Sequence, residues 1–343
     1  MRKLLNTLYV TSPNAYLSRD GENVVVTSDK EERFRAPVHN LESIVCFSYP
    51  GASPALVGLC CERGVGICYL SPNGRFLARV TGGVSGNVLL RRKQYRVADS
   101  ADEVCALASS FIAGKILNCR NVLLRFARDH KEKRGAQEVL EAARYLTVYG
   151  GRLRQCVSVD AVRGLEGDAA REYYAVFDYL ITDPKDQFRF KGRTRRPPLD
   201  AMNALLSFFY ALLSHDCASA LETVGLDPQV GFLHRDRPGR LSLALDLMEE
   251  LRPYLVDRFV LTIVNNGQVS PSGFLRKESG AVVMDEPTRK TVIAEWQKRK
   301  QEEITHPFLE EKISVGLLPY AQALLLARHL RGDLDGYPPF LVR

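Results

Sequence analysis

The chain has 343 residues and carries a formal net charge of +7. This length predicts about two domains with sizeable hydrophobic cores. The N-terminus lacks the apolar run and small-residue cleavage site of a signal peptide, and no stretch approaches the roughly 18 uncharged apolar residues of a membrane span. We therefore expect a cytoplasmic protein without a membrane partner.

The positive charge is concentrated in short stretches, and Arg91–Arg96 carries four basic residues and no acid. Clustered positive charge favours a polyanionic partner, most often nucleic acid, whereas a solvated surface is the alternative interpretation. The eight cysteines lie mostly in apolar runs, and none forms a C-x-x-C pair. That usage is typical of reduced, buried cysteines in a cytoplasmic protein.

The first part of the chain has the pattern of β-strands. Short runs rich in β-branched and aromatic residues predict strands at Thr7–Thr11, Asn23–Val26, Ser43–Phe47, Ile67–Leu70 and Phe76–Val80. Asp20-Gly21 and Asn73-Gly74 have the composition of hairpin turns. One helix is expected over Ala55–Arg63, where Ser53 can cap its start and Gly64 can end it. These elements predict a small β-rich domain over residues 1–84.

The remainder, residues 85–343, has helical patterns. Apolar spacing and end signals predict helices at Val88–Tyr95, Asp102–His130, Arg163–Leu180, Leu199–Leu221, Pro253 to Asn265–Gly267, Arg289–Glu303 and Tyr320–Leu330. We expect Arg289–Glu303 to be a solvated helix because it is highly charged. The fold class is therefore α+β, with a small N-terminal β-rich domain followed by a larger all-α C-terminal domain.

A histidine and two acids near the start of one helix suggest a divalent-metal site. A leucine at every fourth position predicts a buried stripe at Leu243, Leu247 and Leu251. Asp246 and Glu249 are three residues apart and share one helix face, and His234 precedes them in a loop. Carboxylate oxygens with one imidazole suit Mg²⁺ or Mn²⁺. The alternative is that both acids lie on a solvated face.

Glu166 stands at the head of an otherwise apolar helical face that continues through Ala170, Tyr173 and Phe177. We place it in the first turn of the helix predicted over Arg163–Leu180. A buried, unpaired acid is costly, so Glu166 needs a partner unless it simply interacts with the helix N-terminus. From the residues alone we prefer the second interpretation.

A basic segment, defined here as residues 185–196, follows that helix and has six basic residues against one acid. The basic residues are Lys185, Arg189, Lys191, Arg193, Arg195 and Arg196. Their density suits phosphate contacts, and the interleaved Phe188 and Phe190 could stack on an unpaired base. We expect this segment to bind DNA and guide a strand, with a solvated connector as the alternative.

Several long motifs in one order resemble a known family. They are LLNTLYV at 4–10, ASPALVGLCCERG at 52–64, SPNGRFLARVTG at 71–82, SGNVLLRRKQYR at 85–96, RGLEGDAAREYY at 163–174, GRTRRPPLDAMNALLSFFY at 192–210 and GFLHRDRPGRLSLALDLMEELRP at 231–253. The chain thereby resembles the CRISPR-associated endonuclease and integrase of the adaptation module, in the branch found with type I systems. The resemblance covers nearly the full length.

The resemblance assigns the metal and catalytic roles to three residues. The family's GLEG motif matches Gly164–Gly167, its G-aromatic-x-H motif matches Gly231–His234, and its D-x-x-[DE] motif matches Asp246–Glu249. The implied ligands of Mg²⁺ or Mn²⁺ are Glu166, His234 and Glu249, although many members have Asp at the last position. Asp246 is then a candidate for supporting a ligand without itself touching the metal. Glu250 points about 100° around the helix from Glu249 and is not expected to take part.

The family also implies what such a site does. A 3′-hydroxyl of a prespacer attacks a phosphodiester at the boundary of a CRISPR repeat, as part of prokaryotic antiviral defence. The implied partners are double-stranded DNA, a second copy of the chain in a homodimer, and a dimer of a small CRISPR-associated protein. We expect the β-rich part to dimerise and bind that partner, and catalysis to lie wholly beyond residue 150. The alternatives are a metal-dependent nuclease acting on branched DNA without integration and a non-catalytic DNA-binding scaffold.

Overall fold

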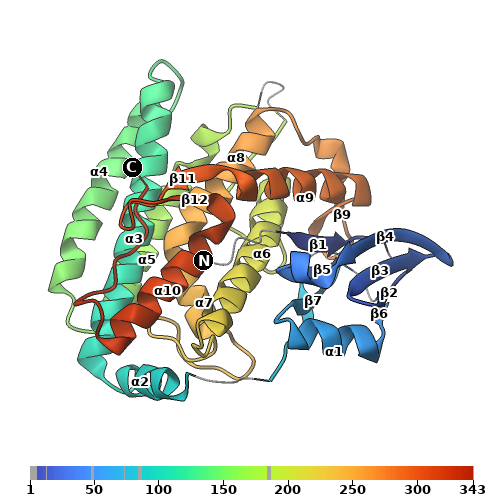
Figure 1. Cartoon of the computed structure of the whole chain (residues 1–343). Helices are drawn as coiled ribbons and strands as arrows, with labels where there is room; N and C mark the ends of the chain where they lie inside the picture. Colours follow the sequence, from blue (N-terminus) through green and yellow to red (C-terminus); the bar gives the residue numbers. More distant parts are fainter. Residues whose placement is uncertain are drawn as a thin grey trace.

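The structure is a computed structural model that describes residues 6–12, 14–47, 50–72, 74–83, 87–183 and 187–342. Figure 1 shows the N-terminal strands gathered at one side of the molecule and most of the helices at the other. A mixed α+β fold with N-terminal strands and a helical C-terminal region is therefore confirmed.

The N-terminal strands form two four-stranded sheets. One has the order β1-β5-β7-β8, in which β1, β5 and β7 are parallel and β8 is antiparallel; the other has the order β4-β3-β2-β6. The strands are β1 Thr7–Val10, β2 Ala15–Asp20, β3 Asn23–Ser28, β4 Glu31–Pro37, β5 Ser43–Phe47, β6 Gly51–Ala52, β7 Gly66–Leu70 and β8 Phe76–Val80. The sequence pattern missed β2, β4 and β6; the strand-poor composition of β4, EERFRAP, explains one of these omissions.

The predicted turns and caps of this region agree with the structure where it is described. Gly21 connects antiparallel β2 and β3 with a φ of +58°, which favours glycine. Asn73 of the second predicted turn lies outside the described residues, whereas β7 and β8 pair antiparallel on either side of it. Helix α1 spans Pro54–Glu62, and Ser53 caps it by accepting a hydrogen bond from the amide of Leu56 at 3.2 Å.

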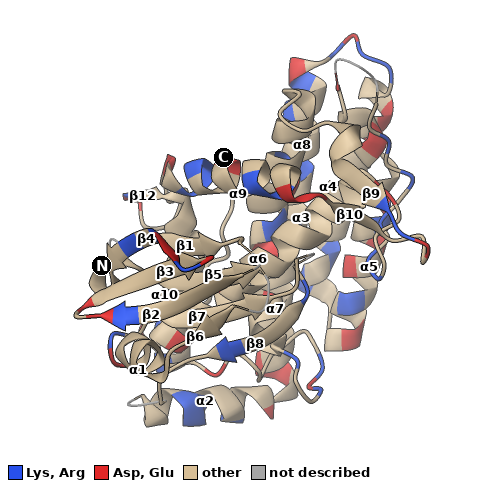
Figure 2. Cartoon of the chain, turned by 90° about the vertical axis from the view of Figure 1, so that its right-hand side faces the viewer, with Lys and Arg blue, Asp and Glu red and all other residues tan. Residues whose placement is uncertain are grey.

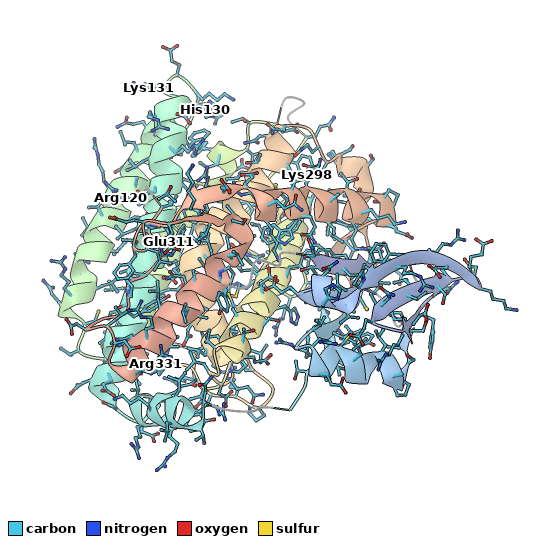
Figure 3. All side chains as sticks on the ribbon, viewed as in Figure 1. Arg120, His130, Lys131, Lys298, Glu311 and Arg331 are labelled. Atoms are coloured by element: carbon cyan, nitrogen blue, oxygen red, sulfur yellow. The ribbon has the colours of Figure 1, made fainter. Side chains whose placement is uncertain are left out.

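Long helices form most of the remaining chain. They are α2 Val88–Ala98, α3 Ala101–Asp129, α4 Ala136–Arg152, α5 Val159–Ala175, α6 Ala201–Thr223, α7 Ser242–Leu251, α8 Arg258–Asn265, α9 Glu286–Gln301 and α10 Leu318–Arg331. The prediction omitted α4, which lies antiparallel beside α3 in a hairpin whose far end is marked by His130 and Lys131 (Figures 1 and 3). A π-helical segment over Arg252–Asp257 joins α7 directly to α8, where the sequence suggested a new helix at Pro253.

Two features of the C-terminal region correct the sequence-based expectations. It is not all-α, because β9 Phe274–Arg276 pairs with β10 Val282–Met284, and β11 Glu303–Thr305 pairs with β12 Lys312–Ser314. Helix α9 is not solvated on all sides either. Its Trp296 is 1% exposed and packs against Phe209 of α6. One face of α9 is therefore buried, although most of its residues are charged or polar.

Helix α6 lies at the centre of the helical region. It is long and apolar enough to cross a membrane, but most of it is buried inside the protein, as expected of a core helix. Phe208 of α6 stacks on Phe47 of β5 with ring centroids 5.3 Å apart, so the large core continues into the β1-β5-β7-β8 sheet. A second, smaller core lies within the β-rich part. The proposed boundary between residues 84 and 85 lies outside the described residues, and the two-domain division stays a prediction.

His215 of α6 lies at this junction and predicts an acid-sensitive stability. Its ring nitrogens lie 3.5 Å from the sulfur of Cys68 in β7, and burial, assisted by Arg79, lowers the pKa of His215 to about 4. The unfolded chain, with a histidine pKa of about 6.5, binds more protons between these values, so the free energy of unfolding falls as pH drops from about 6.5 to 4. Urea unfolding across this range should show a smaller decline for His215→Gln, by up to about 3 kcal/mol. An identical decline in both proteins contradicts this assignment.

Candidate metal centre

The three ligand residues implied by the sequence motifs line one cleft. This cleft has a volume of about 350 Å³ and is bordered by Arg163, Glu166, Leu233, His234, Arg235, Arg237, Arg240 and Glu249. Its walls come from α5, the loop before α7, and α7 itself. Residues more than 60 positions apart in the sequence therefore converge on one concave surface rich in arginine.

Glu166 is not in the first turn of its helix. Helix α5 begins at Val159, where Ser158 caps it by accepting a hydrogen bond from the amide of Ala161 at 3.3 Å. Glu166 therefore lies about two turns further along, too far for a favourable interaction with the helix N-terminus. The preferred interpretation from sequence is wrong, and the partner that a partly buried acid needs is present as Lys115 of α3.

Asp246 holds the loop that carries His234. This fully buried carboxylate accepts hydrogen bonds from the amides of Phe232 at 2.6 Å, Leu233 at 2.9 Å and His234 at 2.9 Å. The same carboxylate lies 2.6 Å from Nδ1 of His234. With Nδ1 donating to this carboxylate, Nε2 is the ring nitrogen left for a metal, and no described residue hydrogen-bonds to it. The arrangement is the one that a metal-binding histidine requires.

Two further side chains and one glycine fix the same loop. Gln94 of α2 donates to the carbonyls of Asp227 at 2.8 Å and Val230 at 2.9 Å, and Arg163 of α5 donates to the carbonyl of Leu233 at 2.7 Å. A Cβ atom at Gly231 would lie 2.8 Å from a carboxylate oxygen of Asp246, so only glycine allows this close approach. The His234 loop is thus bound to α2, α5 and α7.

Glu249 is 3% exposed and has cationic partners at both oxygens. Lys115 lies 2.7 Å from Oε2, and Arg252, one turn along the chain, lies 3.0 Å from Oε1. Burial alone would raise the pKa of Glu249, but Arg252 and Lys115 outweigh it and lower this pKa to about 2. The carboxylate is therefore ionised, as a metal ligand must be.

Lys115 is the residue of this site that the sequence analysis missed. Its ammonium contacts both Glu166 and Glu249, so the site is not confined to residues beyond 150. Burial tends to lower the pKa of Lys115, but Glu249 and Glu166 together raise it above its usual value. A Cβ at Gly114 would lie 2.8 Å from Cβ of Glu250, so glycine lets α3 come close enough to α7 for this contact. The signal was a charged residue in the apolar stripe Phe111, Lys115 and Cys119.

The residues present fit a hard divalent cation. Two carboxylates and one imidazole with a free nitrogen are oxygen and nitrogen donors of the kind that bind Mg²⁺ or Mn²⁺. As the side chains stand, no three Asp, Glu, His or Cys groups within the described ranges lie close enough to ligate one ion. Lys115 lies between the two carboxylates instead.

Glu250, excluded from the site by its direction, has a different role. It is fully buried and faces the C-terminal segment, where Oε2 accepts from the amide of Phe340 at 2.9 Å. Its other oxygen accepts from Gln322 at 2.8 Å and from the hydroxyl of Tyr337 at 2.5 Å. The two consecutive acids of α7 therefore contact different parts of the protein: Glu249 contacts Lys115 and Arg252, and Glu250 contacts the C-terminal segment.

The basic segment is described from residue 187 onward, and Lys185 lies outside the described residues. Arg189, Lys191, Arg195 and Arg196 are exposed. Phe188 and Phe190 are only 3% and 5% exposed, so the expectation that they stack on a DNA base is wrong. They instead fill the core, Phe190 against Phe177 with ring centroids 4.9 Å apart.

Arg193 differs from the other described basic residues of this segment. Its guanidinium donates to the side chains of Asn203 at 2.7 Å and Ser207 at 3.1 Å and lies over the ring of Tyr210. These contacts bind the segment to α6, so Arg193 has a structural role that the count of basic residues did not reveal.

Comparison with known proteins identifies the family. Residues 8–298 match the family model described as CRISPR associated protein Cas1. The chain is also 51% identical to "CRISPR-associated endonuclease Cas1 1" of Chlorobaculum tepidum, over 100% of both proteins. The chain belongs to the Cas1 family. An endonuclease activity and a role in CRISPR spacer acquisition follow from this membership.

Solved structures share the Cas1 fold at low sequence identity. The structure titled "Casposase bound to integration product" aligns with a TM-score of 0.83 and 20% identity, covering 99% of this chain and 95% of that one. A chain of a "Cas6-RT-Cas1--Cas2 complex" aligns with a TM-score of 0.84 and 21% identity, covering 98% of this chain and 36% of that one. At these identities the likeness shows the fold.

The contacts of Glu250 change the consequence of removing it. Glu250→Ala leaves the buried Phe340 amide and Tyr337 hydroxyl without an acceptor, and each such loss costs about 1–3 kcal/mol. Gln322 also loses Glu250 but keeps the Tyr337 hydroxyl and the carbonyl of Pro338 as acceptors. We expect the free energy of unfolding to fall by about 3 kcal/mol in urea denaturation. Glu303→Ala, at an exposed acid of β11, is the matched control and should change it by less than about 0.5 kcal/mol. Equal stability of the two variants rules out the role assigned to Glu250.

Proposed function

We propose that this Cas1 protein is a metal-dependent integrase whose active site is the cleft between α5, the His234 loop and α7. The observation that carries the proposal is the convergence of Glu166, His234 and Glu249, from three separated motifs, on that one cleft. The arginines around the cleft suit a polyanionic substrate.

These three residues would hold one Mg²⁺ or Mn²⁺ ion. When bound, such an ion polarises a phosphoryl oxygen, lowers the pKa of an attacking hydroxyl and stabilises the charge that develops. The protein orients the donors: Asp246 fixes the His234 ring, and Arg252 fixes one oxygen of Glu249. Asp246 thereby acts on the site through His234.

The proposed reaction is a transesterification in DNA. The 3′-hydroxyl of a prespacer attacks a phosphodiester at the repeat boundary, one P–O bond forms and another breaks, and the proton lost by the attacking hydroxyl is regained by the departing 3′-oxygen. The number of phosphodiester bonds is unchanged, so the step needs no ATP. Water in place of the hydroxyl gives strand cleavage, in agreement with the endonuclease name of the relative from C. tepidum.

One residue of the basic segment, Arg196, acts electrostatically on an arginine of this cleft. Burial and nearby positive charges, among them Arg237, Arg163 and Arg196, lower the pKa of Arg240, which lines the cleft. Arg196 is therefore close enough to add its field to that of the cleft arginines. We propose that Arg189, Lys191, Arg195 and Arg196 bind the backbone of a double-stranded DNA substrate and guide a strand toward the ion.

We further propose that the protein acts in the cytoplasm as a homodimer with a dimer of a small CRISPR-associated protein. The fold that it shares with a chain of the "Cas6-RT-Cas1--Cas2 complex" supports the second partner. The β-rich part, with two sheets of its own, is the half that we assign to dimerisation and partner binding.

Substitution of the proposed ligands tests the active site. We expect Glu166→Gln, His234→Ala and Glu249→Gln each to reduce insertion of a labelled prespacer into a repeat-containing plasmid by at least about 100-fold with Mn²⁺. DNA binding, measured by anisotropy, should stay within about twofold. Glu172→Gln, on α5 outside the cleft, is the control and should retain full activity.

The same assay separates the alternative functions. Efficient insertion by His234→Ala would falsify the ligand assignment. Cleavage of branched DNA without insertion into the plasmid identifies a nuclease. A protein that neither cleaves nor inserts DNA, and whose DNA binding is unaffected by Glu166→Gln, is a scaffold.

The salt dependence of DNA binding tests the basic segment. Arg195→Ala/Arg196→Ala should reduce the slope of log affinity against log salt by roughly two units, about one for each lost phosphate contact. The matched control is Arg328→Ala/Arg331→Ala, which makes the same charge change on α10 (Arg331 is labelled in Figure 3) and should leave the slope unchanged. Equal slopes for both variants and the wild type identify the segment as a solvated connector.

A further inference from the structure

The ion pairs of Lys115 place a fixed positive charge where the proposed metal ion is needed. Its ammonium contacts Glu166 and lies 2.7 Å from Oε2 of Glu249, and its side chain is 10% exposed. A buried lysine with two carboxylate partners is held in place, because separating it from them would leave buried charges without a partner of opposite sign. Figure 2 shows Lys and Arg residues at many other places along the helices, for example on α2.

We propose that Lys115 is an internal cation that holds Glu166 and Glu249 together in the metal-free protein and must give up these carboxylates for the divalent ion to bind. This inference rests on the proposed metal site, and it adds that the Lys115 ammonium competes with the divalent ion for the two carboxylates. In the described residues no ready-made set of three metal donors exists, so side chains of the site must move for an ion to bind.

The structure contains a place to which the ammonium can move. A small cavity of about 10 Å³, room for about one water molecule, is lined by Lys115, Asp257 and Arg252. Asp257 is 1% exposed and accepts hydrogen bonds from the hydroxyls of Tyr173 at 3.1 Å and Tyr210 at 2.5 Å. A lysine displaced from Glu249 therefore finds a second buried carboxylate across that cavity.

The competition has two measurable consequences. Without Lys115, two negative carboxylates face each other in the metal-free protein, so its Tm should fall, and Mn²⁺ should raise the Tm more than it does in the wild type. The affinity for Mn²⁺ should increase because a positive charge no longer opposes the ion. We expect about tenfold tighter binding, equivalent to about 1.4 kcal/mol.

The experiment is a calorimetric titration of Mn²⁺ into the purified full chain, with thermal unfolding measured before and after metal addition. The variants are Lys115→Met and Lys115→Gln; the second keeps polarity and serves if the first does not fold. The matched control is Lys300→Met, which removes another buried lysine, 4% exposed and paired with Asp216 at 3.1 Å, outside the cleft. This control should lower the Tm without changing the Mn²⁺ affinity.

The outcomes distinguish this inference from the proposed function. Tighter Mn²⁺ binding by either Lys115 variant, but not by the control, supports the competition. Unchanged or weaker binding by a folded Lys115 variant, alongside normal binding by the wild type, overturns the competition alone. No Mn²⁺ binding by the wild type and by both Lys115 variants overturns the proposed metal site itself.

Discussion

Three buried acids on the ten-residue helix α7 connect the helix to three other parts of the helical region. Asp246 binds the loop before the helix, Glu249 binds α3 and the π-helical segment after α7, and Glu250 binds the C-terminal segment. Each acid is buried at a cost that only its own partners offset. Because the three directions differ, α7 has a single orientation in which all three are satisfied, and that orientation faces Glu249 into the cleft.

The geometry at the end of α7 depends on a change of helix type. Arg252 begins the π-helical segment, and its guanidinium reaches back to Glu249 while lying over the ring of Tyr210 at 5.0 Å. Asp257, at the end of that segment, accepts hydrogen bonds from Tyr210 and Tyr173. A π-helical turn is costly and is common at functional sites. Here it lies within a network of contacts that joins α5, α6 and α7.

Features of this arrangement that depend on residues close together in the sequence could be predicted from it. Contacts between residues far apart in the sequence could not. The caps at Ser53 and the Leu stripe of α7 are set by neighbours a few residues apart, so spacing was sufficient to predict those helices. The roles implied for Glu166, His234 and Glu249 came from family motifs, because no local pattern says that residues from separate helices will meet. The true partner of Glu166 lies 51 positions earlier, in α3, which is why the helix-terminus interpretation failed.

The same distinction explains the basic segment. From composition alone, the phenylalanines and the arginines of this segment would both be assigned to DNA binding. The number of such residues does not show which side chains are buried. The chain alternates there: Phe188 and Phe190 enter the core while Arg189 and Lys191 between and beyond them face solvent. An irregular segment with two buried aromatic anchors loses less conformational freedom on binding than a free loop does. The burial that removes these rings from base stacking therefore also fixes the position of the exposed cations, to which we assign the proposed phosphate contacts.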